Sequence, residues 1–180
     1  FSTVAIAVYG VYFKLQSFVF MPVFGLNNGI VPIVAYNFGA KYKKRIIDSI
    51  KMCAVVALII MGVGTLIFEV FPTQLLAMFS PNEEMLEIGI PALRIIAIHF
   101  PIAAIGITFT SVFQAFGRGF LSMCVSFIRQ IFALLPSAWL LSLTGNINNI
   151  WWAFVIAELI SLIACIFAMK NVYKTQIKQL

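Results

Sequence analysis

The stretch from Met21 to Arg45, MPVFGLNNGIVPIVAYNFGAKYKKR, decides how this chain folds. It is apolar enough to cross a bilayer, and it ends in a burst of positive charge. It nevertheless holds eight residues of kinds that weaken helices or are costly in lipid: Pro22, Gly25, Asn27, Asn28, Gly29, Pro32, Asn37 and Gly39. A reading of the chain has to explain why a membrane helix contains them.

The composition indicates an α-helical membrane protein. Of the 180 residues, 62% are hydrophobic and 10% are charged, whereas a typical soluble domain has about 25% charged residues. The apolar residues form runs of roughly 20, one helix-spanning length, rather than the short alternating segments of an outer-membrane barrel. The net charge of +6 does not indicate a nucleic-acid partner, because the basic residues lie beside apolar spans and not in a patch with interleaved aromatic residues.

The predicted fold class is therefore all-α, a polytopic integral membrane helix bundle with five transmembrane helices. Charged and turn residues bound the five spans, which cover residues 3–38, 46–71, 88–116, 120–143 and 150–169. Between the second and third spans we expect a connector near the membrane surface, and after the fifth a cytoplasmic tail at 170–180. Because the chain starts with Phe1 and not Met, we expect it to be a fragment of a longer protein.

The distribution of lysine and arginine predicts the orientation of the bundle. Short loops that carry these residues stay in the cytoplasm. The first loop, the third loop and the C-terminal tail carry them, whereas the alternate loops have none and one of these holds Glu83, Glu84 and Glu87. The N-terminus is expected outside the cell and the C-terminus in the cytoplasm.

The first span is predicted to bend and to present polar groups. Its roughly 36 residues would measure ~54 Å, against a hydrocarbon core of ~30 Å, and Pro22 and Pro32 are the expected bend points. Five residues spaced four and three apart share one face of this span, and the small residues among them let a neighbouring helix come close: Gly25, Gly29, Pro32, Tyr36 and Gly39. Asn27 and Asn28 lie roughly 15–18 Å above the inner boundary, where amides face a neighbour or a cavity and not lipid.

Charged residues within the spans predict two ion pairs. Arg129 and Glu158 lie at similar depths, roughly 14 and 16 Å from the cytoplasmic side, on spans joined by a tight turn. An unpaired charge there costs at least ~2.5–3.5 kcal/mol, so we expect the two to pair, either for structure or as part of a coupling path. Glu69 and Arg94 are expected to pair nearer the outer surface. His99, the single histidine, is either a hydrogen-bonded core residue or a proton-handling group.

Three runs carry a resemblance to a known family. The run AVYGVYFKLQSFVFMPVFGLNNGIVPIVAYNFGAKYKKR, residues 7–45, resembles the signature around the eighth helix of the multidrug and toxic compound extrusion (MATE) family, in its bacterial branch. The resemblance continues through PALRIIAIHFPIAAIGITFTSVFQAFGRG, residues 91–119, and FIRQ, residues 127–130. It covers nearly the whole chain, which would match the eighth to twelfth helices, a partial C-terminal transmembrane lobe over residues 1–180.

The resemblance implies a secondary active antiporter in the bacterial inner (plasma) membrane. Such a protein has twelve helices in two lobes, and exports lipophilic cationic drugs from a central cleft in exchange for Na⁺ or H⁺. Its implied partners are the lipid bilayer, the drugs and the missing N-terminal lobe, with no nucleic acid, no metal site and no cofactor beyond the coupling ion. Some members carry an acidic residue on the helix matching residues 88–116, which hold none here, so the coupling ion stays open.

The polar residues expected in the substrate cleft are Gln16, Asn27, Asn28, Tyr36, Asn37 and His99. The sequence has no GxSxG, HExxH or P-loop, so we expect no enzyme activity. Two alternatives stay open. One is a lipid-linked saccharide flippase of the same superfamily, and the other is a non-transporting membrane assembly subunit.

Overall fold

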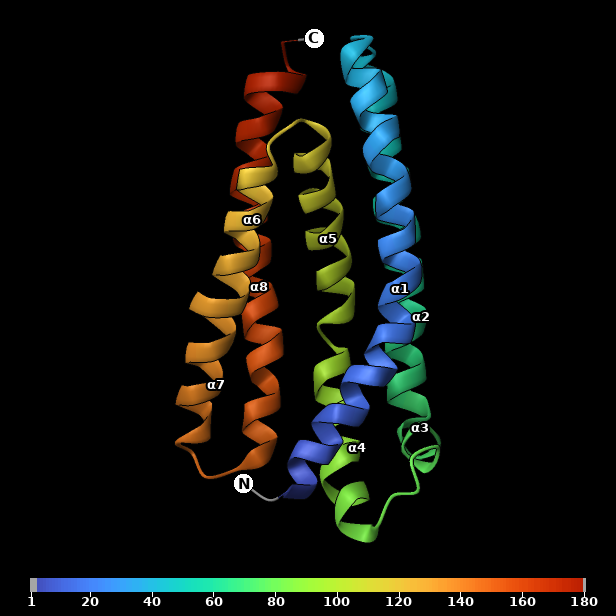
Figure 1. Ribbon diagram of the computed structural model, residues 1–180, viewed down its shortest axis with the longest axis vertical. Coiled ribbons are helices and arrows are strands. Elements are labelled where there is room, and N and C mark those ends of the chain that lie inside the picture. The colour runs from blue at the N-terminus through green and yellow to red at the C-terminus, as the bar shows by residue number, and fades with distance from the viewer. Residues whose placement is uncertain (1–2, 180) are drawn as a thin grey trace.

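The computed structural model describes residues 3–179, and in that part of the chain every regular element is helical (Figure 1). The elements in chain order are α1 (Thr3–Gly39), α2 (Lys43–Val70), α3 (Pro72–Ala77), α4 (Glu83–Ala97), α5 (Phe100–Ala115), α6 (Gly119–Phe127), the π-helical segment η1 (Ile128–Leu134), α7 (Leu135–Ser142), α8 (Ile147–Val172) and the π-helical segment η2 (Tyr173–Ile177). By length and composition, four continuous helices can each cross a membrane: Thr3–Gly39, Lys43–Val70, Gly119–Ser142 and Ile147–Ile177. The pair α4 and α5 gives a further span, bent by 47° at its break. The fold is thus an all-α polytopic bundle.

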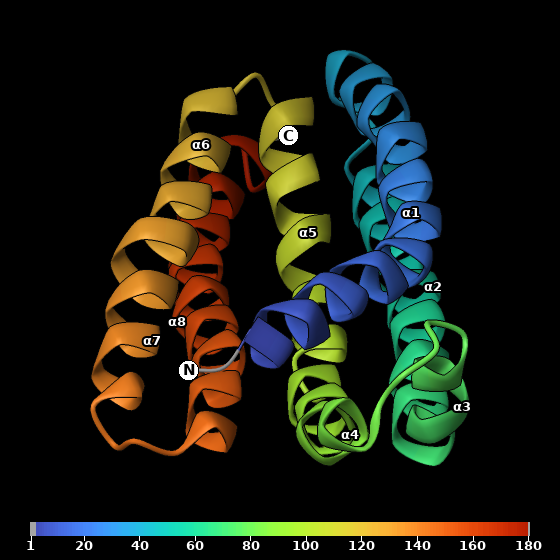
Figure 2. The same ribbon diagram turned by 60° about the horizontal axis from the view of Figure 1, so that its bottom comes forward.

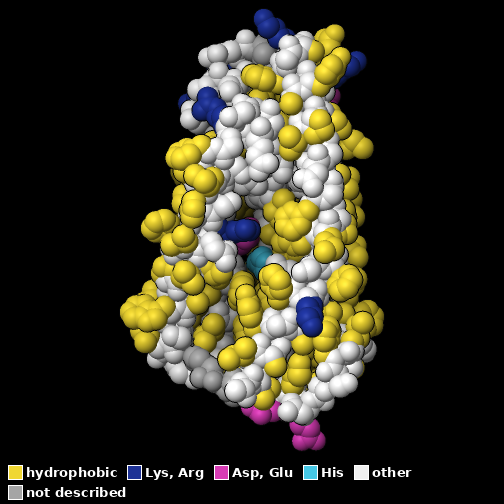
Figure 3. Space-filling model, viewed as in Figure 1, with side chains coloured by type: hydrophobic (Ala, Val, Ile, Leu, Met, Phe, Trp, Pro, Cys, Tyr) yellow, Lys and Arg dark blue, Asp and Glu magenta, His cyan; other side chains and the backbone are white. Residues whose placement is uncertain are grey.

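The helices form two groups with the broken span between them. Figures 1 and 2 show α1 beside α2 on one side and α6, α7 and α8 on the other, with α4 and α5 in contact with both groups. The two chain ends lie at opposite ends of the bundle (Figure 1). Figure 3 shows most lysine and arginine side chains at the end where the chain terminates, and acidic side chains at the other end.

Helix α1 is a single element with one clear bend. Figures 1 and 2 show the bend where the dark-blue N-terminal segment meets the lighter-blue remainder. Pro22, inside the helix, cannot donate to the carbonyl of Phe18, and its ring pushes against that carbonyl. Pro32 is also inside the helix, but Figure 1 shows no second bend of this size along α1. The long helix therefore fits the bundle by changing direction near Pro22.

The third predicted span, 88–116, is not one helix. The helix begins earlier, at Glu83, where the Asn82 side chain caps it by accepting a hydrogen bond of 2.8 Å from the Met85 N–H. It then breaks between Ala97 and Phe100, because Pro101 has no N–H to donate to the Ala97 carbonyl. The Thr65 hydroxyl of α2 lies 3.1 Å from that carbonyl and 3.0 Å from the Met61 carbonyl of its own helix, so its one hydrogen is shared between the two acceptors and partly replaces the missing donor.

The fourth span changes its winding in the middle. Residues Ile128–Leu134 are π-helical, between the α-helical segments α6 and α7. Pro136, in the first turn of α7, lacks the N–H that would reach the carbonyl of Phe132, so the regular α-helical pattern cannot continue through this turn. Such π-helical segments occur frequently at functional sites, and this one carries Arg129 and Gln130.

Two apolar cores leave a polar layer between them. One core is centred on Tyr12, Phe68 and Phe100, and the second on Phe113 and Phe116 near the basic end. Along α1 the buried apolar residues stop at Val23 and resume at Ile30. Along α5 they stop at Ala104 and resume at Val112, and along α8 they stop at Ala157 and resume at Cys165. The polar residues in these three gaps include Asn27, Asn28, Thr108, Glu158 and Ser161.

The glycine face of α1 makes no close helix contact within the described chain. A Cβ built on Gly25, Gly29 or Gly39 would meet nothing within 4 Å, and Pro32 and Tyr36 on the same face are exposed. The predicted close packing at these positions is therefore absent between the helices described. The helices do pack closely at Gly64, where a Cβ would clash with the Val19 side chain, and at Gly89, where it would lie 2.9 Å from Leu76 Cδ1.

Candidate functional site

The centre of the candidate site is an ion pair between η1 and α8. Arg129 Nη1 lies 3.6 Å from Glu158 Oε2, and the two side chains are 37% and 7% exposed. The turn between α7 and α8 is short, which brings the two spans side by side as the sequence predicts (Figure 1). Glu158 also faces α5, since a Cβ on Gly106 would lie 3.3 Å from Glu158 Oε1. The absence of a side chain at Gly106 leaves room for the carboxylate.

Two cavities meet at this ion pair. The larger, about 240 Å³, opens towards the basic end of the bundle, and the smaller, about 190 Å³, towards the other end; Arg129 and Glu158 line both. Figure 3 shows a hollow in this face of the molecule with basic, acidic and histidine side chains at its floor. The Glu158 carboxylate is therefore reachable from two directions, although its side chain is mostly buried.

The larger cavity is lined mainly by amide and hydroxyl groups. Asn27 and Asn28 of α1 lie on one side of it. The other polar lining residues, besides the ion pair, are Thr110, Ser111, Gln114, Ser122, Ser126 and Ser161. Several of these groups are already held in place, as Gln114 Nε2 donates to Ser122 Oγ at 3.1 Å and Asn27 Nδ2 donates to the Val23 carbonyl at 2.8 Å. The cavity thus offers fixed dipoles in the middle of an apolar bundle.

The smaller cavity combines aromatic rings with the carboxylate. Tyr9 and Phe13 of α1 and Phe154 of α8 line it, and the rings of Tyr9 and Phe154 stack with centroids 6.1 Å apart. Gln16 and His99, both expected in the cleft, line this cavity together with Gln130. Aromatic faces beside a carboxylate can hold an organic cation by cation–π and Coulomb attraction.

His99 lies at the break between α4 and α5. Its side chain is 4% exposed, and its Nδ1 hydrogen-bonds the Ile96 carbonyl, so Nδ1 carries the proton. The ring packs at 5.1 Å from the Phe100 ring and 6.2 Å from the Phe154 ring, measured between centroids. The histidine is therefore both a hydrogen-bonded core residue and a lining residue of the smaller cavity.

Two of the expected cleft residues lie away from both cavities. Tyr36 is 73% exposed on the outer face of α1, and Asn37 is buried nearer the basic end. Asn37 Nδ2 donates to the Ile33 carbonyl at 2.8 Å, and its Oδ1 has no hydrogen-bond partner among the described residues. The rise of the helix explains the difference, because eight or nine residues beyond Asn28 correspond to ~12–14 Å along the axis, which is beyond the polar layer.

The outer pair of Glu69 and Arg94 is peripheral to the site. Arg94 Nε lies 3.9 Å from Glu69 Oε2, and the side chains are 53% (Arg94) and 38% (Glu69) exposed. Neither residue lines the two cavities. An ion pair exposed to this degree contributes about 0–1 kcal/mol in water, so it is a surface contact between α2 and α4.

Sequence reasoning missed the hydroxyl lining of the larger cavity. Ser122, Ser126 and Arg129 are spaced four and three apart, which places them on one side of the fourth span. The spacing between Glu158 and Ser161 on α8 is three, with the same consequence. Serine residues three or four positions from a charged residue, and so on the same side of the helix, could have indicated this lining from the sequence.

Comparison with known proteins identifies the family. The MatE family model matches residues 1–140, more than three quarters of the chain. The chain belongs to the MatE family. It is 28% identical over 163 residues to the multidrug export protein MepA of Staphylococcus haemolyticus, an alignment that covers 91% of the chain and 36% of that relative. The MepA of Staphylococcus aureus is 29% identical over 175 residues, which cover 94% of this chain and 36% of that relative.

Solved structures of MATE transporters share the fold. The MATE multidrug transporter DinF-BH matches with a TM-score of 0.84 and 27% identity, over 96% of this chain and 38% of its own, in the C-terminal lobe. The Vibrio cholerae transporter VcmN, in its bent form, matches with a TM-score of 0.90 at 21% identity, and the match covers 98% of this chain and 40% of VcmN. Two structures of MATE family transporters also match, one in an inward-facing conformation with a TM-score of 0.86 and one in an outward-facing conformation with a TM-score of 0.88, both at 17% identity.

The chain spans little more than a third of the curated relatives that it matches, about 36% of their length. The family and these relatives are transporters and not enzymes. The transmembrane fold and the membership of a multidrug efflux transporter family therefore hold for this chain.

Proposed function

We propose that the full-length protein containing this chain is a secondary active antiporter, which exports lipophilic cationic compounds in exchange for Na⁺ or H⁺. This chain would supply most of its C-terminal lobe, in a plasma membrane with the C-terminus in the cytoplasm. One observation carries the proposal: a single carboxylate, Glu158, is shared between an aromatic cavity and an amide- and hydroxyl-lined cavity, inside a bundle of a multidrug transporter family.

Competition for the carboxylate provides a physical basis for exchange. The charge of Glu158 can be balanced by Arg129, by a proton, by Na⁺ or by an organic cation, but one negative charge does not balance two of these at once. Binding of the drug cation and of the coupling cation would then exclude each other. That exclusion is the requirement for antiport, because the site must release one cation before it returns with the other.

The two cavities would bind different ligands, the smaller one the drug and the larger one a small cation or water. The rings of Tyr9, Phe13 and Phe154 would hold the flat, apolar part of a drug, with cation–π attraction of roughly 0.5–2 kcal/mol for each good contact. The oxygens of Asn27, Asn28 and the serine residues of the larger cavity suit a small hard cation or an ordered water. Transport itself would follow from rocking of one lobe against the other. The similarity of this fold to both an inward-facing and an outward-facing transporter supports a lobe that moves as a unit.

The experiment is ethidium efflux from drug-sensitive bacterial cells that express the full-length protein. The Na⁺ gradient and then the proton gradient are collapsed in turn, and loss of efflux under one collapse names the coupling ion. Glu158→Gln removes the shared charge with little change of shape, and we expect it to abolish coupled efflux. The matched control is Glu69→Gln, which removes a carboxylate from the exposed outer pair and should leave efflux intact.

Two results would contradict the proposal. One is a well-expressed wild-type protein without any gradient-dependent efflux, which would favour the flippase or the assembly subunit. The other is Glu158→Gln efflux that equals that of Glu69→Gln, which would remove Glu158 from the exchange site.

A further inference from the structure

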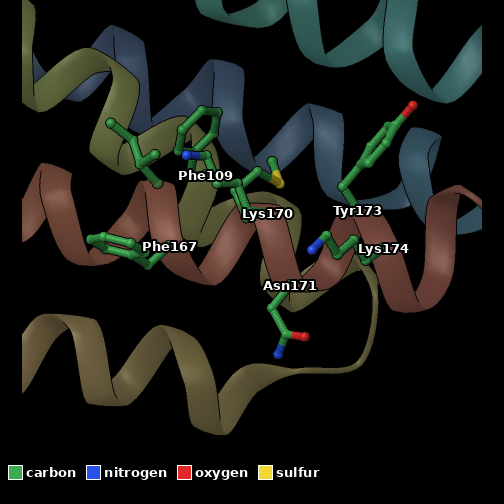
Figure 4. Close-up of a pocket in the computed structure, with 8 residues that line it drawn as sticks. Phe109, Phe167, Lys170, Asn171, Tyr173 and Lys174 are labelled. Carbon is green, nitrogen blue, oxygen red and sulfur yellow. The ribbon is translucent and has the colours of Figure 1, made fainter.

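A further cavity lies away from the ion pair, at the basic end of the bundle. Its volume is about 630 Å³, within the ~300–1,000 Å³ typical of ligand pockets. Figure 4 shows it between the end of α8 and α5, with Phe109 and Phe167 on the apolar side and Lys170, Asn171, Tyr173 and Lys174 along α8 and η2. Neither Arg129 nor Glu158 reaches it, so it is separate from the proposed exchange site.

The lining divides into an apolar wall and a cationic edge. Phe109, Ile166, Phe167 and Met169 form the wall, and the Phe167 side chain is 68% exposed. Lys170 and Lys174 are four residues apart on α8 and η2, so their side chains lie on the same side of the helix. No acidic residue lines this pocket, and neither ammonium group has an ion pair within residues 3–179.

We propose that this pocket binds an anionic phospholipid, with its phosphate between the Lys170 and Lys174 ammonium groups and the start of an acyl chain against Phe109 and Phe167. The chemistry of the pocket matches both halves of such a molecule, because two cations without an ion pair border an apolar surface at one end of a membrane-spanning bundle. Lys170 Nζ lies 5.9 Å from the centroid of the Phe167 ring, so the cationic edge and the apolar wall are in contact. Tyr173 and Asn171 add a phenol and an amide that can donate to phosphate or glycerol oxygens.

Neighbouring contacts hold the cationic edge in place. Lys43 Nζ donates to the Lys178 carbonyl at 3.2 Å, and an Arg118 guanidinium N–H donates to the Thr175 hydroxyl at 3.4 Å. These contacts tie the end of η2 to the start of α2 and to the turn before α6. A lipid in the pocket would itself lie against α5, α8 and η2, the elements that line it.

The test is native mass spectrometry of the full-length transporter in detergent, with phosphatidylglycerol and phosphatidylcholine of identical acyl chains. We expect phosphatidylglycerol to be retained and phosphatidylcholine to be lost. Because one lysine near an anionic surface changes binding by about five-fold, Lys170→Gln with Lys174→Gln should weaken phosphatidylglycerol retention by about 25-fold. The matched control is Lys41→Gln with Lys44→Gln, which removes the same charge at the same end of the bundle but outside the pocket.

A second variant tests the apolar wall. Phe109→Ala should weaken phosphatidylglycerol retention while leaving both lysines in place, and size-exclusion chromatography checks that each variant is folded. Equal weakening by the control pair would overturn the proposal in favour of a diffuse charge effect. Displacement of the lipid by millimolar inorganic phosphate, or no effect of Phe109→Ala, would overturn it in favour of a free phosphate site. None of these results depends on efflux, so this inference can fail while the antiporter proposal stands.

Discussion

Removal of the Thr65 hydroxyl is expected to destabilise the break between α4 and α5. Thr65 Oγ1 lies 3.1 Å from the Ala97 carbonyl, which Pro101 leaves without its helical donor, and 3.0 Å from the Met61 carbonyl of its own helix. Thr65→Val keeps the side-chain shape but leaves the Ala97 carbonyl unpaired. Hydrogen bonds between membrane helices contribute about 0.6 kcal/mol on average and up to ~1.7, and an unpaired buried polar group costs ~1–3 kcal/mol. We expect a loss of about 1–2 kcal/mol in the free energy of unfolding.

The assay is SDS-induced unfolding of the full-length protein in mixed micelles, with Thr65→Ser as the matched control that retains the hydroxyl. A double-mutant cycle with Pro101→Ala isolates the contact. In that background the backbone N–H that alanine restores at position 101 can serve the Ala97 carbonyl, so Thr65→Val should cost close to nothing. The same loss in both backgrounds would refute the reasoning, since the hydroxyl would then stabilise something other than the break.

The remaining predictions concern packing and the exchange site. Gly64→Ala should lower stability by about 1–3 kcal/mol because its Cβ would clash with Val19, whereas Gly62→Ala, with nothing within 4 Å of its Cβ, should be tolerated in the same unfolding assay. Arg129→Gln leaves the mostly buried Glu158 unpaired, so it should reduce the amount of folded protein in the membrane by the equivalent of about 2–3 kcal/mol. The double variant with Glu158→Gln should restore that amount. If quantitative membrane blots show no such recovery, the result would argue against the pair. Asn28→Leu should reduce drug resistance in growth assays without loss of expression. Tyr36→Leu, on the outer face of α1 and away from both cavities, should leave drug resistance unchanged. Equal resistance in the two variants would mean that Asn28 does not line the cleft.

The sequence predicts the all-α membrane fold and the meeting of Arg129 with Glu158 for physical reasons. A hydrophobic run of fixed length has few structures open to it in a bilayer, because each backbone polar group must be satisfied within the helix. Depth along a helix can be counted at ~1.5 Å per residue, and a short turn forces two charges at equal depth to be neighbours. Local rules are enough for these two features.

Partner-dependent features were not predictable in the same way. Helical periodicity shows that Gly25, Gly29 and Gly39 share a face, but it cannot show how closely a neighbour approaches that face. In the structure a groove separates Gly25 and Gly29 from α2, and no described atom lies within 4 Å of a Cβ built at any of the three glycines. Mean hydropathy also treats residues 88–116 as one span, although one proline without a donor breaks it beside His99. The larger cavity arises where serine, threonine and amide side chains from four elements converge, and each element alone has only a few scattered polar residues.

The open glycine face of α1 has a mechanical consequence. Helices that interlock do so through ridges of side chains set into grooves, and such contacts resist sliding until they jump to the next register. Gly25 and Gly29 add no side chain to the ridges of this face, and a Cβ at either position would touch nothing in the described chain. A helix that packed along this stretch would meet no side chain at these two positions, so it would be expected to shift along the axis of α1 in steps smaller than a whole turn. The glycines that leave this face unpacked in the described chain would also lower its resistance to the sliding of a neighbouring helix.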